Sequence, residues 1–226
     1  MKRPVTTLFM LMSVDGKIST GASDDLDVDK DFPNIPGIKE GLRQYYDIEK
    51  TTDLWSLNSG RVMAKVGVNE RPLPKKRDVS FAVVDNSHLT TGGLMYFAAL
   101  SKCFVLITSN KSHPAFGVDA ENINIIYQEA FDPLEALGRL REDYGCERIT
   151  IQTGGTLNGV FLRAKAFDYI DIVIAPALIG GKDTPTLIDG DSLMSPGELG
   201  KLGVLKLEEC VALEDSYARL RYKVIG

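Results

Sequence analysis

IQTGGTLNGVFLRAKAFDYIDIVIAPALIGGK, residues 151–182, decides the fold class, because a strand, a glycine turn, a helix, a strand and a second glycine turn follow one another in it. Ile149–Gln152 has the apolar character of the end of a buried strand. Gly154 and Gly155 then allow a sharp bend and the close approach of a ligand, since neither has a Cβ atom. Apolar residues at helical spacing follow over Asn158–Ala166, and the first N–H groups of that helix would point toward the bend. The pattern predicts either a phosphate-binding turn or a plain tight turn, because it matches neither of the common glycine-rich phosphate motifs.

Strands and helices alternate along the rest of the chain. We expect strands at 6–14, 53–57, 81–84, 103–108 and 123–126, and helices at 38–48, 59–65, 93–101 and 132–142. The chain ends in two strands, Leu205–Val211 and Tyr217–Val224, joined by a short turn. This order predicts an α/β protein in which residues 1–226 form a single domain, with a mostly parallel central sheet, helices on both faces and a C-terminal antiparallel hairpin.

Composition excludes several classes of protein. With 44% hydrophobic and 25% charged residues among 226, the chain resembles an ordinary globular protein. It contains no apolar run near the ~20 residues that cross a bilayer, and its short apolar N-terminal stretch is interpreted as a core strand, so a cytoplasmic location without membrane contact is expected. A net charge of −5 with scattered basic residues disfavours a nucleic-acid partner.

The cysteines and histidines do not indicate a metal site. Cys103, Cys146 and Cys210 are far apart and lack a C-x-x-C spacing, which favours reduced thiols. His88 and His113 have no partner at ligand spacing, and both are expected to lie on the surface. We therefore expect no bound metal.

Three glycine-containing bends follow apolar strands. They are Ser13–Lys17, Asn58–Arg61 and Gln152–Thr156. In an open α/β sheet, ligands bind beyond the carboxyl ends of the strands, so these bends are predicted to line one crevice. Their hydroxyls, amides and cations suit a phosphate-bearing ligand with a polar heterocycle, although each bend is also explained as a turn alone.

Individual polar residues at these bends have two interpretations each. Asp15 either binds nearby backbone N–H groups or contacts the substrate, and Lys17 is either solvated or neutralises a phosphate. Arg61, in the first turn of a short helix, either holds a 2′-phosphate or reaches solvent. Arg71 is a weaker candidate for a substrate phosphate, and Asn86 either forms a turn or contacts a cofactor ribose.

Several motifs together resemble a known family. Met12–Ile18, Gly154–Leu157 and Ala175–Gly181 are similar in order and spacing to motifs of the riboflavin-pathway pyrimidine reductases, which have the fold of dihydrofolate reductase. The similarity extends over nearly the whole chain, including the final hairpin. It implies a homodimeric, NADPH-dependent oxidoreductase that converts the ribosyl group of a phosphorylated aminopyrimidine to ribityl.

The resemblance also implies roles for particular residues. Leu11 and Ser13 would lie near the nicotinamide or the substrate, the cofactor phosphates would bind at Gly154, Gly155, Thr156, Leu157 and Asn158, and Gln152 would contact the substrate. The residues at the other bends add expected cofactor contacts from Gly60, Arg61 and Asn86 and expected substrate contacts from Asp15 and Arg71. Asp15 and Lys17 are weak candidates for the proton source, since nothing in the sequence requires either.

At some positions the sequence differs from the family pattern, and these differences affect the expected substrate contacts more than the expected cofactor contacts. Gln152 stands where the family has a substrate-contacting glutamate, and Phe9 replaces a polar residue. A neutral amide still forms hydrogen bonds but cannot act as a carboxylate base. Two alternatives therefore stay open: a reductase of a pterin or another small imine or carbonyl compound on the same fold, and a non-catalytic nucleotide-binding protein.

Overall fold

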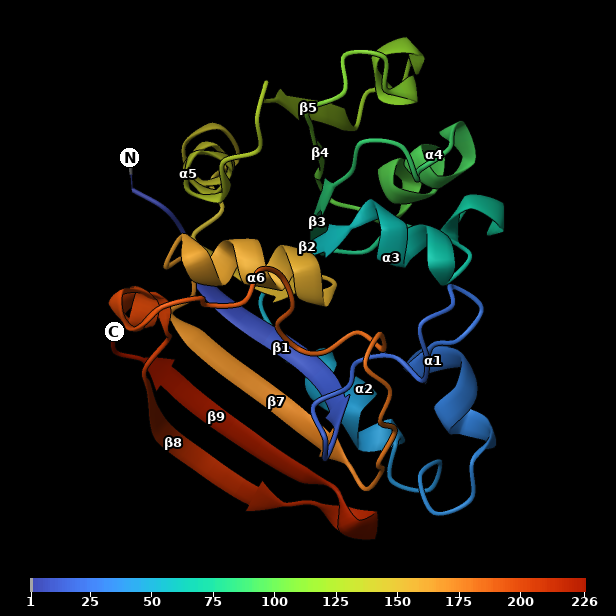
Figure 1. Ribbon diagram of the computed structural model, residues 1–226. Coiled ribbons are helices and arrows are strands. Elements are labelled where there is room, and N and C mark those ends of the chain that lie inside the picture. The colour runs from blue at the N-terminus through green and yellow to red at the C-terminus, as the bar shows by residue number, and fades with distance from the viewer. Residues whose placement is uncertain (1) are drawn as a thin grey trace. The chain divides into compact units, whose positions relative to one another are not determined.

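The computed structural model describes residues 2–226 (Figure 1). Close contacts divide the chain into two compact units. Unit 1 comprises the N-terminal residues up to Val5 together with Asp53–Thr153, and unit 2 comprises Thr6–Thr52 together with Gly154–Gly226. The expectation that residues 1–226 act as one domain stays a prediction.

Unit 1 is built on a parallel sheet. Its strands, in spatial order, are β5 (Ile123–Tyr127), β4 (Phe104–Thr108), β3 (Ser80–Val84), β2 (Trp55–Ser59) and β6 (Arg148–Gln152). All four neighbouring pairs run parallel, as the alternating sequence predicts. Every residue of β4 is buried, which explains why this strand is a continuous apolar run without alternation.

Three α-helices belong to unit 1: α3 (Gly60–Lys65), α4 (Thr91–Leu100) and α5 (Pro133–Tyr144). Helix α5 begins as predicted, because the Asp132 carboxylate accepts hydrogen bonds from two backbone N–H groups of the first turn and Pro133 follows it. Ser59 occupies the N-cap position of α3, but its side chain makes no capping hydrogen bond.

Unit 2 carries a mixed sheet in the order β1 (Val5–Ser13), β7 (Tyr169–Ala175), β9 (Ala218–Val224) and β8 (Leu205–Ala212). Strands β1 and β7 are parallel, whereas β9 is antiparallel to both β7 and β8. The predicted C-terminal antiparallel hairpin is therefore confirmed. A β-bulge interrupts the β8–β9 register between Leu207 and Glu209.

The unit 2 sheet has helices on both faces, as expected (Figure 1). On one face, Phe9 and Val173 pack against residues near and in α1 (Val28–Asp31) and α2 (Arg43–Glu49), and the Phe9 and Tyr45 rings stack with centroids 5.1 Å apart. On the other face lies α6 (Gly155–Arg163), whose Leu162 shares a cavity with sheet residues.

Two helices differ from the sequence prediction. Ile38 and Leu42 are buried as expected, but they lie in turns that precede α2, so this helix begins at Arg43, five residues after the expected start. Helix α6 begins at Gly155, three residues before the expected start.

None of the helices among residues 2–226 is both long enough and apolar enough to cross a membrane.

Candidate active site

The glycine turn after β6 opens directly into α6. Gly154 is the N-cap in an extended conformation, and the first helical hydrogen bond runs from the Asn158 N–H to the Gly154 carbonyl, with an N···O distance of 3.0 Å. The N–H groups of Gly155, Thr156 and Leu157 therefore have no carbonyl within the helix to bind. Together with the helix dipole, they make this end of α6 suited to an anion.

A neighbouring loop explains two of the α6 glycines. A Cβ atom on Gly155 would lie 2.3 Å from the Thr186 carbonyl oxygen and 2.3 Å from Asp189 Oδ2. A Cβ atom on Gly159 would lie 2.1 Å from the Asp189 carbonyl oxygen. The segment 186–189 therefore lies directly on α6. This contact within the chain explains why positions 155 and 159 are glycines, whether or not a ligand also binds there.

Asn158 belongs to this contact. Its side chain is fully buried, and its Nδ2 donates a 2.8 Å hydrogen bond to the Leu187 carbonyl. The amide thus holds segment 186–189 against the helix, and the predicted cofactor contact of Asn158 stays a prediction.

The turn after β1 is tied to the second glycine turn through Asp15. The exposed Asp15 carboxylate accepts hydrogen bonds from Ser13 Oγ at 2.5 Å, Ile179 N at 3.1 Å and Gly180 N at 2.6 Å. The Ser13 hydroxyl and then the Gly180 N–H lower the pKa of Asp15 to about 2. Asp15 is therefore ionised near neutral pH, which makes it unsuited to the proton-donating role considered from the sequence.

Lys17 is also engaged within unit 2. It is 9% exposed, and its Nζ donates to the carbonyls of Gly181 at 2.7 Å and Thr184 at 2.9 Å. Of the two interpretations of Lys17, the solvated one is wrong, and the two carbonyls direct the ammonium group toward the second glycine turn. Ser13 and Leu11 are buried as well, so Leu11 would meet a ligand through its backbone.

A neutral hydrogen-bond chain lies at the carboxyl ends of β2 and β6 in unit 1. The Ser56 hydroxyl donates to Gln152 Oε1 at 3.1 Å and accepts from Asn58 Nδ2 at 2.9 Å. Asn58 and Gln152 are direct partners in the parallel register. The Gln152 amide is therefore oriented by two buried residues, and the chain carries no charge.

A buried carboxylate follows β3 and was not singled out from the sequence. Asp85 is 3% exposed. It accepts hydrogen bonds from the backbone N–H groups of Ser87, His88 and Leu89 and from the imidazoles of His88 and His113, each ring nitrogen 3.0 Å from a carboxylate oxygen. Burial alone would raise the pKa of Asp85, but these hydrogen bonds outweigh burial and lower it.

His113 corrects the expectation of a surface histidine, since its side chain is fully buried. Its Nδ1 accepts a hydrogen bond from Ala115 N, so Nε2 carries the proton that points to Asp85. Both ring nitrogens of the neutral form are thus used within the fold.

No group of three histidine, cysteine or acidic residues between 2 and 226 could hold a metal ion.

Gly60 is required by the same carboxylate, because a Cβ atom there would lie 2.2 Å from Asp85 Cγ. The next residue, Arg61, is exposed in the first turn of α3.

The other two candidate residues of unit 1 are bound within the fold. Arg71 donates to the Val66 carbonyl at 2.7 Å, and the Asn86 amide oxygen accepts from Ser109 N at 2.8 Å. Asn86 therefore joins the ends of β3 and β4, which accounts for it without a ligand.

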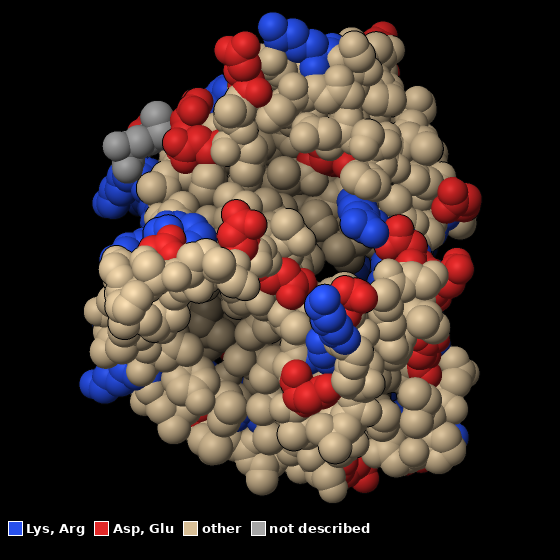
Figure 2. Space-filling model, viewed as in Figure 1, with Lys and Arg blue, Asp and Glu red and all other residues tan. Residues whose placement is uncertain are grey.

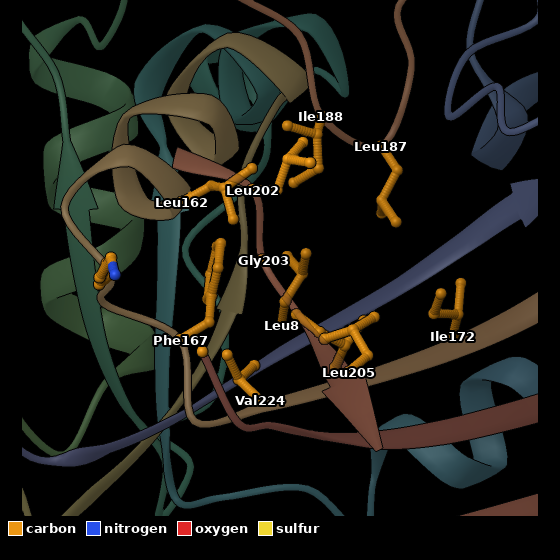
Figure 3. Close-up of a pocket in the computed structure, with 13 residues that line it drawn as sticks. Leu8, Leu162, Phe167, Ile172, Leu187, Ile188, Leu202, Gly203, Leu205 and Val224 are labelled. Atoms are coloured by element: carbon orange, nitrogen blue, oxygen red, sulfur yellow. The ribbon is translucent and has the colours of Figure 1, made fainter. Parts of the chain in front are cut away.

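The cavity in unit 2 is chemically different from these polar sites. It encloses about 290 Å³ beside the 186–189 segment and the β8–β9 hairpin. Its walls include Leu8, Leu162, Phe167, Ile172, Leu205 and Val224, whose apolar side chains converge (Figure 3). Such a lining does not suit a polar, phosphorylated substrate.

The RibD C-terminal domain family matches residues 4–216, nearly the entire chain. The protein belongs to this family. A member from Methanothermobacter thermautotrophicus, 2,5-diamino-6-ribosylamino-4(3H)-pyrimidinone 5′-phosphate reductase, is 26% identical over 199 residues, which are 84% of this chain and 86% of the relative. A RibD C-terminal domain protein of this kind is an oxidoreductase.

Solved structures confirm the dihydrofolate reductase-like fold. Acinetobacter baumannii RibD has a TM-score of 0.68 at 14% identity and aligns with 99% of this chain, which spans 59% of the length of that protein. Dihydrofolate reductase from Enterococcus faecalis, in complex with NADP(H), has a TM-score of 0.51 at 13% identity over 98% of this chain and 97% of its own. At these identities, the likeness concerns the fold alone.

Replacing Gly159 with alanine should destabilise this RibD-family protein, although alanine normally favours a helix by about 1 kcal/mol over glycine. The added Cβ atom would meet the Asp189 carbonyl, so we expect the free energy of unfolding to fall by about 1–3 kcal/mol in urea denaturation. Gly200→Ala is the control, because nothing lies within 4 Å of a Cβ atom there. Equal stability of the two variants would contradict the proposed contact of segment 186–189 with α6.

Replacing Asp85 with asparagine should lower the free energy of unfolding at neutral pH by about 2–4 kcal/mol, because an amide cannot accept all the N–H donors. The folded-state pKa of Asp85 is below its usual value of about 3.9, so the stabilisation is present above about pH 4 and is lost as the pH falls through the folded-state pKa. Urea denaturation at several pH values measures both effects. In the control Asp143→Asn, which removes an exposed pair with Arg139, a loss of about 0.5 kcal/mol or less is expected.

Proposed function

We propose that the protein is an NADPH-dependent reductase that converts the ribosyl group of 2,5-diamino-6-ribosylamino-4(3H)-pyrimidinone 5′-phosphate to ribityl. The observation that carries the proposal is the family match over residues 4–216. The named reductase from M. thermautotrophicus, aligned over 84% of this chain, supports the substrate assignment.

Each unit offers residues that suit one part of the proposed cofactor. In unit 2, the N–H groups of Gly155, Thr156 and Leu157, after Gly154, suit a pyrophosphate. In unit 1, Gly60, Arg61 and Asn86 lie at strand ends where a nucleotide ribose would bind. When bound, NADPH supplies the hydride, and the task of these residues is to bind and orient it.

Each unit also offers polar residues that suit a phosphorylated substrate. We propose substrate contacts of Ser13 and Asp15 for unit 2, and substrate contacts of Gln152 and Arg71 for unit 1. Asp15, ionised near neutral pH, would accept hydrogen bonds from a substrate hydroxyl or amino group. Lys17 is held by two carbonyls, and Asp15 does not carry a proton at that pH, so solvent is the proposed proton source.

The neutral chain of Ser56, Asn58 and Gln152 favours a second candidate function. Without the carboxylate that the family resemblance leads one to expect at position 152, the same fold would reduce a pterin or another small imine or carbonyl compound. A non-catalytic nucleotide-binding protein is the remaining alternative.

Turnover separates these candidates. The wild-type protein should oxidise NADPH, followed by its absorbance, when the diaminopyrimidine ribosyl phosphate is added. Gln152→Ala should lower kcat/KM about tenfold, because one oriented hydrogen bond is lost, and Gln152→Glu tests whether a carboxylate improves turnover. Val160→Ala, an exposed position on α6, is the control.

Binding of NADPH without turnover of this substrate would reject the substrate, and a panel of pterins and small imines would then identify the second candidate. Binding without turnover of any compound, even in Gln152→Glu, would leave the non-catalytic alternative.

We further propose that two copies form a homodimer through the apolar face of the β8–β9 hairpin in unit 2. Leu205 is 42% exposed and Leu207 is 50% exposed on this face. The side of unit 2 seen in Figure 2 has a broad area with few charged side chains around the hairpin. Exposed apolar faces of this kind are typical of protein interfaces.

Sedimentation measurements test the proposed dimer. The wild-type protein should have the mass of two chains, and Leu207→Lys should weaken the association at least about tenfold by placing a charge on the apolar face. Lys206→Gln, on the opposite face of the same strand, should leave the mass unchanged. A monomeric wild-type protein would refute the proposal.

A further inference from the structure

The apolar cavity of unit 2 takes no part in the proposed reductase function, because its lining does not suit a phosphorylated compound. Its walls come from strands β1, β7, β8 and β9, from α6, and from the segments that join α6 to β7 and β7 to β8. Figure 2 shows a hollow with uncharged walls beside the β8–β9 hairpin. A concave site with such walls accepts apolar groups of a ligand.

The volume of the cavity sets the size of the group that fits it. An engineered cavity of ~150 Å³ lined by leucine, isoleucine and phenylalanine side chains stays dry and binds benzene. The unit 2 cavity has the same kinds of side chain and encloses about 290 Å³. It therefore suits an apolar group of about eight to ten carbon atoms. Each methylene group that moves from water into it should tighten binding about fourfold.

One residue of the lining carries a charge. Among the described residues that line the cavity, Lys165 alone has a polar side chain. Lys165 is also exposed, so it lies where the cavity meets solvent. It forms no ion pair with any residue between 2 and 226. The cavity thus combines an apolar interior with one cation that has no counter-charge within the fold.

The backbone at Lys165 has a conformation that favours glycine. Helix α6 ends in a Schellman motif, in which Lys165 N donates to the Leu162 carbonyl and Ala166 N donates to the Phe161 carbonyl, both at 2.9 Å. Lys165 occupies the left-handed position of this motif with a φ of 52°. A side chain at this position costs conformational energy. The lysine therefore points to a role of its side chain beyond the end of the helix.

The surroundings of Lys165 favour an anion. Segment 198–203 lies beside the end of α6, because Arg163 Nη1 donates to the Lys201 carbonyl at 3.0 Å. The acids of the two segments 162–168 and 198–203 are both bound within the fold. The Asp168 carboxylate accepts from Thr6 N at 2.9 Å, and Glu198 pairs with Lys201 Nζ at 2.5 Å. Lys165 is therefore the cation that remains for an anionic ligand.

We propose that the cavity binds a small amphipathic carboxylate, whose apolar chain fills the interior and whose carboxylate binds the Lys165 ammonium group. The site lies entirely within unit 2 and does not depend on the proposed reductase function. A second copy of the chain is the competing occupant, because Leu205 belongs both to the lining and to the proposed dimer face. An apolar side chain of a second copy would match the walls but would leave Lys165 without a counter-charge.

Isothermal titration calorimetry of the wild-type protein with octanoate tests the proposal. The dissociation constant should be about 1 mM or lower. Octanol should bind about three- to tenfold more weakly, because it lacks the charge that Lys165 binds. Hexanoate should bind about tenfold more weakly than octanoate, because it buries two fewer methylene groups. Absence of octanoate binding, or equal binding of octanoate and octanol, overturns the proposal.

The variant Lys165→Gly tests the role of the cation. It should bind octanoate and octanol equally. Because glycine adopts the left-handed conformation readily, its midpoint of urea denaturation should equal or exceed that of the wild-type protein. Lys223→Gln is the matched control, since Lys223 is exposed on the opposite face of the strand from the lining residue Val224. A preference for octanoate that persists in Lys165→Gly overturns the proposal.

A second pair of variants locates the apolar chain. Leu202 lines the cavity and is 50% exposed, so Leu202→Gln should fold and should weaken the binding of octanoate and octanol alike, by about fivefold. Leu199, 57% exposed on the same turn of helix, lies outside the lining, and Leu199→Gln should bind both compounds as the wild-type protein does. Equal effects of the two substitutions would place the chain elsewhere and refute the proposed site. Circular dichroism establishes that each variant is folded.

The same titration of Leu207→Lys, which should weaken the proposed dimer, tests the competing occupant. Equal octanoate binding by this variant and the wild-type protein supports a cavity that is open to a small ligand. Binding by Leu207→Lys alone means that a second copy covers the cavity in the wild-type protein, and this result overturns the proposal.

Discussion

The close contact between α6 and segment 186–189 is the constraint on which unit 2 depends. Gly155 and Gly159 leave no room for a Cβ atom beside Thr186 and Asp189, and the buried Asn158 amide binds the same segment. The contact places the segment beside the start of the helix, where free N–H groups favour an anion. Helix geometry, loop position and the candidate phosphate site therefore depend on the same few residues.

Elements with strong local signals could be predicted from the sequence. The continuous apolar β4 indicated a buried parallel strand, and Asp132 with Pro133 indicated the start of α5. The start of α6 was less predictable, because glycines are poor helix formers and only the contact with Asp189 explains Gly159. Local spacing does not encode a contact with a segment thirty residues away.

The sequence predicted that the site residues lie at the carboxyl ends of strands. It did not predict which residues these side chains contact. Nothing near His113 in the sequence indicates that it is buried against Asp85, since the partners are far apart along the chain. Lys17 looked solvated for the same reason, because its carbonyl partners follow β7. The sequence alone shows that position 152 carries a neutral glutamine. The structure adds that Ser56 and Asn58 orient its amide through a chain of uncharged hydrogen bonds.

The bulge in β8 preserves the chemical character of a whole surface. Side chains alternate between the two faces of a strand, so Leu205 and Leu207 would ordinarily be opposed to Cys210 and Ala212. One extra residue, Glu208, is accommodated between paired positions, which returns all four to a common face. If Glu208 paired regularly instead, Cys210 and Ala212 would turn to the opposite face of the strand, and Glu209 and Val211 would take their places beside Leu205 and Leu207. Deleting Glu208 would remove the bulge but keep the four side chains together, so the extra residue lengthens the strand without changing the surface that it presents.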